Sequence, residues 1–382
     1  MIKKLYLIGN GFDLAHGLKT RYLDFMVWLH KNDRYTFINI SKLMLDNFLS
    51  KNGYLFENDF RYRRPENKMD IMINTIDLGE IINTEEYKLL DSCFEEPLML
   101  YIMWDSLEEY IYYLFLDEQL AQAENERQNL IEVLKNEEYG EVIDEDIDVL
   151  FRPAQERFER LANLSRDFNE DLFQWVGDVN SSISYIKNSI EFYEAGLDNN
   201  TVISMLPDDF FGDDNYIITF NYSDTIEKLY SKEVCHIHGK YSRSNAPIMG
   251  HTKDISDIFL YYGKESILVK EFYKDYYSII ESYAEYYNKI KGNEKIDEII
   301  VLGLGYNYTD FPYFEKISQL LPDVKWLLYY YSDSDYEKAE NYVKKLNLSR
   351  ENITYASIKE KSPYTEKKFF NEIVFDVQIA EE

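Results

Sequence analysis

Short apolar runs alternate with longer stretches of helical spacing along this chain. The first run, residues 5–8, ends at Gly9 and Gly11, and apolar residues recur at helical intervals from Leu18 onward. Beyond residue 214, similar runs are separated mostly by helical stretches. That alternation is typical of a doubly wound, mainly parallel α/β sheet. The later strands are predicted at residues 216–220, 234–238, 298–302, 324–331 and 352–356. The later helices are predicted at residues 225–230, 264–290 and 335–346, with another beginning at 309–312.

Helical spacing also dominates the long stretch between the first two predicted strands. It is clearest in residues 97–116 and 151–193, whereas residues 117–149 are strongly acidic and predict an exposed helix pair or a mobile excursion. We therefore expect a discontinuous Rossmann-like core, formed by residues 1–30 and 200–382. Residues 31–199 would then be a large helical insertion that serves as a lid or a sensor.

Glycines and polar residues follow several of the predicted strands. In doubly wound sheets, ligands bind outside the carboxyl ends of the strands. The segments that follow these strands should therefore converge on one crevice, which is stronger evidence for a site than any single motif. The segments are residues 9–13, 221–224, 238–239 and 303–310.

The turn after the first strand predicts an anion site. Its backbone amides and the N-terminus of the following helix would together form a binding site for a phosphate. The dinucleotide-binding fingerprint is incomplete, because His16 stands near the position of the expected third glycine. The alternative is an ordinary strand-to-helix turn, in which Asp13 caps the helix.

Two residues at strand ends are candidates for chemistry. His238 suits a general base near neutral pH, or it is a satisfied structural histidine. Asn221 can position a sugar hydroxyl or a water molecule, or it caps the next helix. His236 and His238, with His251 as a possible third ligand, could instead mark a metal site. Cys235 alternates with these histidines and is expected in the core.

Composition excludes several classes of protein. The chain has 382 residues, of which 45% are hydrophobic and 16% aromatic, so it can fold around a large core. Its net charge of -29 repels phosphate backbones, which argues against a broad nucleic-acid surface and against a metal-dependent nuclease built on the histidines. Two cysteines exclude a disulfide scaffold and a four-cysteine zinc site. Without a signal peptide or a long apolar run, we expect a cytoplasmic protein with no membrane partner.

An ordered set of motifs along the chain resembles the AbiH family of bacterial abortive-infection proteins, which act against bacteriophage. The resemblance runs from end to end and implies an antiphage protein, with a phage-encoded trigger protein as a partner. The motifs are residues 9–17 (Gly-Asn-Gly-Phe-Asp-Leu-Ala-His-Gly), 219–224 (Thr-Phe-Asn-Tyr-Ser-Asp) with Glu227, 236–239 (His-Ile-His-Gly) and 303–314.

A more distant resemblance is to sirtuin-like defence domains. In those domains a glycine turn cradles the phosphates of NAD, while an asparagine and a histidine serve hydrolysis of the nicotinamide–ribose bond. Here Asp13 stands where serine is usual, and Ser223 replaces an aspartate, with Asp224 one residue later. The zinc module of sirtuin deacetylases is missing, so deacetylation is not expected. The matching positions are Gly9, Gly11, Thr219, Asn221, Tyr222, His238 and Gly239.

These resemblances imply a sirtuin-like α/β core that binds NAD, or a related nucleotide, as substrate or ligand. Asn221 would orient the ribose or a water molecule, and His238 would act as the general base. No metal is expected. The alternative is a non-catalytic sensor of a nucleotide or a phage protein, and an oligomer is compatible with either function. Residues expected to contact the cofactor are Gly9, Asn10, Gly11, Asp13, Thr219, Asp224, Gly303 and Asp310.

Overall fold

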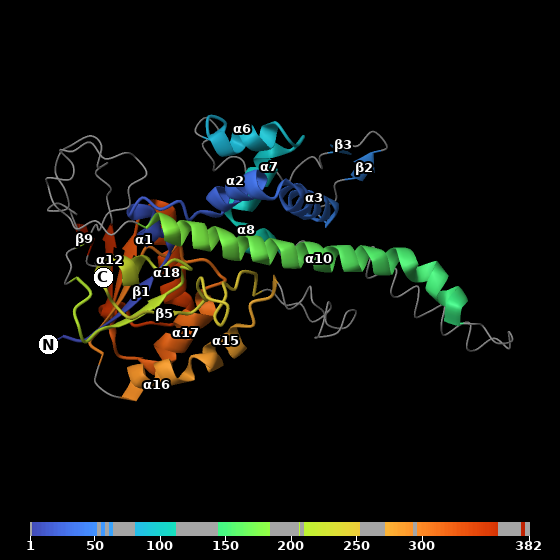
Figure 1. The fold of residues 1–382 in the computed structure, drawn as a ribbon. Helices are drawn as coiled ribbons and strands as arrows, with labels where there is room; N and C mark the ends of the chain where they lie inside the picture. The colour runs from blue at the N-terminus through green and yellow to red at the C-terminus, as the bar shows by residue number, and fades with distance from the viewer. Residues whose placement is uncertain are drawn as a thin grey trace. The chain divides into compact units, whose positions relative to one another are not determined.

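The chain divides into two compact units, which we call the sheet unit and the helical unit (Figure 1). The computed structural model describes residues 2–51, 55–57, 61–63, 81–111, 144–183, 206, 210–252, 272–292, 296–357 and 376–378. The sheet unit comprises Met1–Arg21, Phe173–Ile248 and Lys274–Glu382. The helical unit comprises Tyr22–Leu172 and Met249–Tyr273.

A seven-stranded sheet forms the centre of the sheet unit, in the order β5-β4-β1-β6-β7-β8-β9. All the pairings are parallel except that of β9 with β8, which is antiparallel. Numbered by their appearance in the chain, the parallel strands follow the order 3-2-1-4-5-6 of doubly wound nucleotide-binding sheets. The expected α/β, Rossmann-like architecture is therefore confirmed. The strands are β1 (Lys4–Ile8), β4 (Tyr216–Thr219), β5 (Cys235–His236), β6 (Glu298–Leu302), β7 (Lys325–Tyr330), β8 (Ile353–Ser357) and β9 (Asp376–Gln378).

The central strands are apolar at nearly every position because both faces of the sheet are covered. Leu5, Leu7 and Ile8 in β1 are fully buried, as is typical of parallel strands with helices on both sides. Alternate residues of the strands pack with four helices into one hydrophobic core, which includes Trp326 and, as expected, Cys235. These helices are α15 (Tyr276–Ser282), α16 (Ala284–Gly292), α17 (Phe311–Leu320) and α18 (Asp333–Lys345).

Three shorter helices complete the described part of the sheet unit. They are α1 (Asn10–Ala15), α12 (Thr225–Tyr230) and the 3₁₀ helix η2 (Arg350–Asn352). The helix expected over residues 264–290 differs from the structure, because α15 and α16 are separate helices that meet at Tyr283. Residues 264–271 of that expected helix lie outside the described residues. The hydroxyl of Tyr283 donates to the carbonyl of His236, 2.5 Å away, so the junction is tied to the end of β5.

Aromatic side chains form the core of the helical unit. The rings of Phe25, Phe37, Trp104 and Phe168 contact one another, and the Trp104 indole donates to Ser41 Oγ at 3.0 Å. The elements are α2 (Tyr22–Asn32), α3 (Arg34–Lys51), the antiparallel pair β2 (Leu55–Glu57) and β3 (Arg61–Arg63), α6 (Glu85–Asp91), α7 (Pro97–Asp105) and α8 (Leu107–Tyr110). The helix predicted at 97–116 is thus α7 followed by α8, and residues 112–143, including most of the acidic segment, lie outside the described residues.

One long helix, α10 (Asp144–Ser182), belongs to both units, since the division falls at Leu172. The units therefore differ from the predicted core and insertion at their edges. Residues 22–30 and 249–273 belong to the helical unit, whereas residues 173–199 belong to the sheet unit. The boundary at Leu172 falls inside a continuous helix, and the sequence of such a helix does not indicate where one unit ends and the next begins. Within the parts of the chain that are described, no helix has the combined length and apolar character needed to cross a membrane.

His16, near the position of the third glycine in the nucleotide-binding fingerprint, connects α1 to α12 by hydrogen bonds. Its Nδ1 lies 2.6 Å from the carbonyl of Phe12, and its Nε2 lies 2.5 Å from the hydroxyl of Tyr230. Burial lowers the pKa of His16 to about 4, so the neutral ring donates to Phe12 and accepts from Tyr230. The Tyr230 oxygen in turn accepts from the amide of Leu206 at 3.0 Å.

Replacing Tyr230 with phenylalanine is expected to lower the free energy of unfolding by about 2 to 4 kcal/mol, because two buried polar groups lose their partner. Urea denaturation of the variant and the wild type measures this difference. Tyr277→Phe, which removes a hydroxyl from a side chain that is 71% exposed, is the matched control and should be neutral. Equal stability of the Tyr230 variant and the wild type would show that these hydrogen bonds contribute little.

Candidate functional site

The glycines after β1 bring its turn into direct backbone contact with the loop after β6. The amide of Gly9 donates to the carbonyl of Leu302 at 3.0 Å, and the amide of Gly11 donates to the carbonyl of Gly303 at 2.7 Å. Asn10 between them is exposed, and its side chain donates to the carbonyl of Thr20. A phosphate cradle made by the two glycine amides would require both of these bonds to break. The glycines therefore serve close packing between the loops in this conformation.

Asp13 is buried and faces the loop between β4 and α12. It lies inside α1, whose N-cap is Gly9, so the alternative role of a helix cap does not apply. Its Oδ2 accepts from the hydroxyl of Ser223 at 2.5 Å, and Ser223 Oγ in turn lies 2.8 Å from Thr225 Oγ1. Burial raises the pKa of Asp13 to about 6, against the lowering effect of these hydrogen bonds. Among the described residues, its Oδ1 has no hydrogen-bond partner although it is buried.

Asn221 connects the carboxyl ends of three neighbouring strands. Its side-chain amide donates to the carbonyl of Gly9 after β1, at 3.0 Å. Its backbone amide donates to Thr219 Oγ1 at the end of β4, and its carbonyl accepts from His236 Nδ1 in β5. Asn221, the expected catalytic asparagine, therefore lies at the carboxyl edge of the sheet, where its hydrogen bonds connect β1, β4 and β5.

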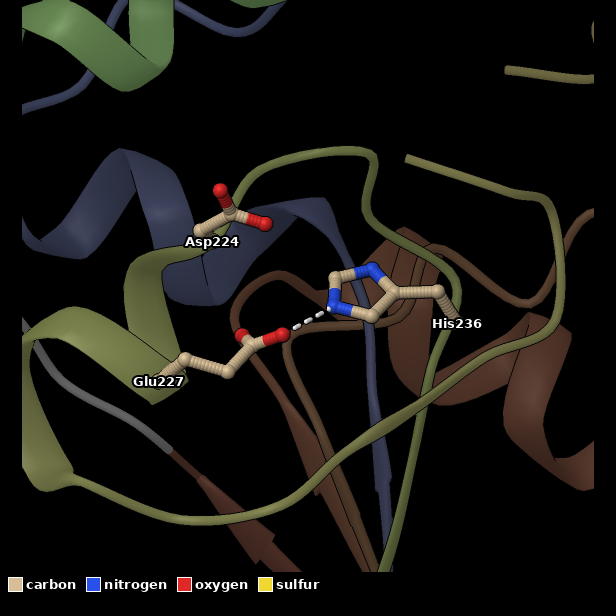
Figure 2. Close-up of side chains that lie close together, drawn as sticks. All are labelled: Asp224, Glu227 and His236. Atoms are coloured by element: carbon tan, nitrogen blue, oxygen red, sulfur yellow. Dashed lines mark hydrogen bonds and ion pairs between the residues drawn. The ribbon is translucent and has the colours of Figure 1, made fainter. Parts of the chain in front are cut away.

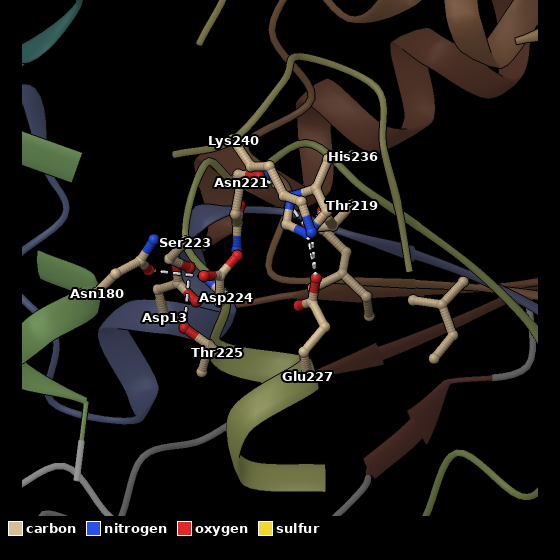
Figure 3. Close-up of polar contacts among 12 residues, drawn as sticks. Asp13, Asn180, Thr219, Asn221, Ser223, Asp224, Thr225, Glu227, His236 and Lys240 are labelled. Carbon is tan, nitrogen blue, oxygen red and sulfur yellow. Dashed lines mark hydrogen bonds and ion pairs between the residues drawn. The ribbon is translucent and has the colours of Figure 1, made fainter. Parts of the chain in front are cut away.

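A cluster of charged residues lies beside Asn221 (Figures 2 and 3). Glu227 Oε1 accepts from His236 Nε2 at 2.7 Å and lies 3.4 Å from the ammonium group of Lys240. Burial opposes ionisation of Glu227, but the hydrogen bond and charge of His236, a backbone hydrogen bond and the charge of Lys240 together outweigh it and lower the pKa of this carboxyl. Burial, followed by the charge of Glu227, raises the pKa of Asp224.

The cluster includes a residue from α10 that the sequence patterns do not indicate. The side-chain oxygen of Asn180 accepts from the amide of Asp224 at 2.8 Å, and its carbonyl accepts from the ammonium group of Lys228 at 2.5 Å. Asn180 is 4% exposed, and Figure 3 shows it beside Ser223 and Asp224. It is far from the motifs in sequence, and a single asparagine in a helix carries no signal for this role.

His238 is a buried histidine with one ring nitrogen unsatisfied. Its ring packs edge-on against Phe220 and Tyr313. Burial, assisted by the charge of Lys274, holds the pKa of His238 well below its usual value, although a hydrogen bond to the backbone of Phe220 acts in the other direction. Its Nε2 has no hydrogen-bond partner in the described part of the chain, and it lies 4.0 Å from Asp310 Oδ1. The ring is therefore neutral, with an acceptor atom facing the N-cap of α17.

The structure thus brings most of the predicted site residues together in the sheet unit. Asp13, Thr219, Asn221 and Asp224 lie in one group of polar residues with Glu227 and Lys240, which we call the polar network (Figure 3). The sequence motifs indicate no role for Glu227 or Lys240. His238 lies near Asp310, and the amide of Gly11 donates to the carbonyl of Gly303. His251 belongs to the helical unit.

The ionisation of Asp13 should make stability depend on pH. Its folded-state pKa of about 6 lies above the reference value of 3.8, so its stabilising contribution is full below pH 3.8 and is lost as the pH rises through 6. Replacing Asp13 with asparagine removes this contribution. Between pH 7.5 and 5, the stability of the wild type relative to the variant should therefore rise by about 1.4 kcal/mol.

Urea denaturation of both proteins at pH 5 and 7.5 checks this prediction. Asp323→Asn, at an exposed position between α17 and β7, is the matched control and should follow the wild type at both values of pH. A difference between the wild type and the Asp13 variant that does not change with pH would contradict the assigned pKa shift.

Comparison with known proteins places this site within a matched region. The family model described as "Bacteriophage abortive infection AbiH" matches residues 5–330, from β1 to the end of β7. All the residues of the polar network lie within that span, as do His238 and Asp310. Searches of curated proteins and of solved structures found no match.

Proposed function

Because the chain belongs to the AbiH family, whose function is bacteriophage abortive infection, we propose that it acts by binding NAD or a related nucleotide and hydrolysing the nicotinamide–ribose bond. Loss of NAD would stop the growth of an infected cell. The proposal extends the family function to a ligand and a reaction, and it assigns the reaction to the carboxyl edge of the sheet.

The observation that carries the proposal is a set of buried polar atoms that lack partners at this edge. They are Asp13 Oδ1, Asp224 Oδ1 and His238 Nε2, counted among the residues that the structure describes. A buried polar atom without a hydrogen bond costs about 1 to 3 kcal/mol, so folded proteins rarely keep several together without a ligand or water to satisfy them. Ligands of doubly wound sheets bind where these atoms lie.

The chemistry of the atoms suits cleavage of an N-glycosidic bond. The transition state resembles an oxocarbenium ion, so nearby carboxylates stabilise its positive charge. Asp13 and Asp224 supply such oxygens. His238 Nε2 accepts the proton of the attacking water, and Asn221 orients the ribose through its side-chain oxygen. The resemblance to sirtuin-like domains in Thr219, Asn221 and His238 supports this assignment.

The phosphate contacts are revised by the geometry of the glycine turn. The amides of Gly9 and Gly11 donate hydrogen bonds to carbonyls at the end of β6 and in the loop that follows it. The exposed Asn10 would therefore be the residue of this turn that contacts the pyrophosphate. Gly303 acts by allowing the loops to pack. Asp310, the N-cap of α17, would contact the ligand next to His238.

The test incubates the purified full-length chain with NAD, with and without an extract of phage-infected cells. Chromatography measures released nicotinamide, and isothermal titration calorimetry measures NAD binding. We expect nicotinamide release that increases with the extract. Binding without release would favour a non-catalytic sensor, the alternative function, while neither binding nor release in both conditions would contradict the proposal.

A further inference from the structure

Three side chains with metal-binding atoms converge at the start of α12. One potential ligand atom from each of Asp224, Glu227 and His236 lies within 4.8 Å of the others. Asp224 is the N-cap of α12 and Glu227 lies three residues later, so both side chains are on the same side of the helix. His236 reaches them from β5, and Figure 2 shows its ring directed at Glu227.

The ring of His236 is held in the orientation that a metal ligand requires. Its Nδ1 donates to the carbonyl of Asn221 at 3.0 Å, which leaves Nε2 directed at the carboxylates. Metal-binding histidines almost always donate their second ring N–H to a carbonyl or carboxylate, because this fixes the tautomer and the ring plane. His236 is also buried, so the surrounding protein fixes the position of its ring.

Both carboxylates keep buried oxygens that the protein does not satisfy. Glu227 Oε2 and Asp224 Oδ1 lack hydrogen-bond partners within the described residues. Asp224 is held in place by its backbone, since its amide donates to Asn180. The ammonium group of Lys240 lies 3.4 Å from Glu227 Oε1, and Oε2 has no hydrogen-bond partner among the described residues.

We propose that Asp224, Glu227 and His236 form a binding site for one divalent first-row transition-metal ion, for which Mn²⁺ is the probe. Two carboxylate oxygens and one imidazole nitrogen suit such ions, and three protein ligands leave coordination positions open for water or a ligand. Metal binding replaces the hydrogen bond between His236 and Glu227 with two bonds to the ion. The proposal does not depend on NAD hydrolysis.

The test titrates Mn²⁺ into the chelator-treated full-length chain and measures free Mn²⁺ by electron paramagnetic resonance. Mn²⁺ is preferred to Zn²⁺ because the free thiols of Cys93 and Cys235 bind Mn²⁺ poorly. We expect saturation at one ion per chain. Glu227→Gln should weaken binding by about 10-fold or more, because loss of a direct ligand should cost at least as much as loss of an outer-shell partner. Asp213→Asn, which removes an exposed carboxylate paired with Lys232, is the matched control and should bind as the wild type does.

Two further measurements test the ligands of the ion even if the Glu227 variant is less stable than the wild type. Electron spin-echo modulation from a directly bound ¹⁴N should appear with Mn²⁺ in the wild type and disappear in His236→Gln. Lys240→Met should tighten Mn²⁺ binding severalfold, because it removes a cation that competes for Glu227. The proposal is wrong if the wild type shows no saturable binding, if Glu227→Gln binds equally well, or if bound Mn²⁺ has no nitrogen ligand. Those results would identify the cluster as an ion-pair network balanced by His236 and Lys240.

Discussion

Substitution of His238 by glutamine is expected to slow release of nicotinamide from NAD by about 100-fold or more, the usual contribution of a general base. Glutamine can still donate a hydrogen bond to the backbone of Phe220, but it has no nitrogen that can take a proton from water. The neutral ring of His238, with Nε2 buried and unsatisfied within the described residues, provides that acceptor in the wild type. The measurement is the rate of nicotinamide release at saturating NAD.

A loss of folding must be separated from a loss of chemistry. The melting temperature and the NAD affinity of the variant should stay close to those of the wild type, because the substitution removes a proton acceptor and little packing. His30→Gln in the helical unit is the matched control and should retain full activity. If His238→Gln releases nicotinamide as fast as the wild type, His238 is not the base.

Much of the fold could be predicted from the sequence because parallel strands covered on both faces are continuous apolar runs. The predicted run at 298–302 coincides with β6, and the run at 216–220 contains β4. Glycines and helix signals between the runs then indicate the alternation that defines a doubly wound sheet. The strand β9 was missed because three residues are too few to show a pattern.

The grouping of these residues at the carboxyl edge of the sheet followed from the same pattern, but their contacts did not. Whether a backbone amide is available to a ligand depends on what it contacts in the folded chain. The amide of Gly11 donates to the carbonyl of Gly303, which is remote in sequence. For the same reason Asn180 could not be found, since only the packing of α10 brings it to Asp224.

The spacing of two histidines did not indicate what each ring contacts. A His-x-His pair draws attention to His236 and His238 together, and the expectation of no metal followed from the lack of an evident third ligand. In the structure His236 faces two carboxylates on α12, whereas His238 faces Asp310. The motif that contains Glu227 predicts no role for it, because its position in the first turn of α12 becomes informative only once β5 is known to lie beside it.

Gly303→Ala is expected to lower the free energy of unfolding by about 2 to 5 kcal/mol. Gly303 has a φ of +72°, a conformation that costs an L-residue about 1 to 2 kcal/mol. An added Cβ would also lie 2.4 Å from the amide nitrogen of Phe12 and 2.9 Å from the carbonyl carbon of Gly11. These atoms belong to the backbone, so the turn after β1 must move, at a cost of about 1 to 3 kcal/mol for overpacking.

Urea denaturation measures the effect, with Gly292→Ala as the matched control. Gly292 lies at the end of α16 with no heavy atom within 4 Å of an added Cβ in the described structure, so its replacement should be neutral or stabilise by up to about 1 kcal/mol. If Gly303→Ala is as stable as the wild type, the close contact between the two loops is not required. Displacement of the turn should also move Asp13, two residues beyond Gly11, away from Ser223. The pH dependence assigned to Asp13 should therefore shrink in Gly303→Ala, which links the packing of the glycines to the polar network of the site.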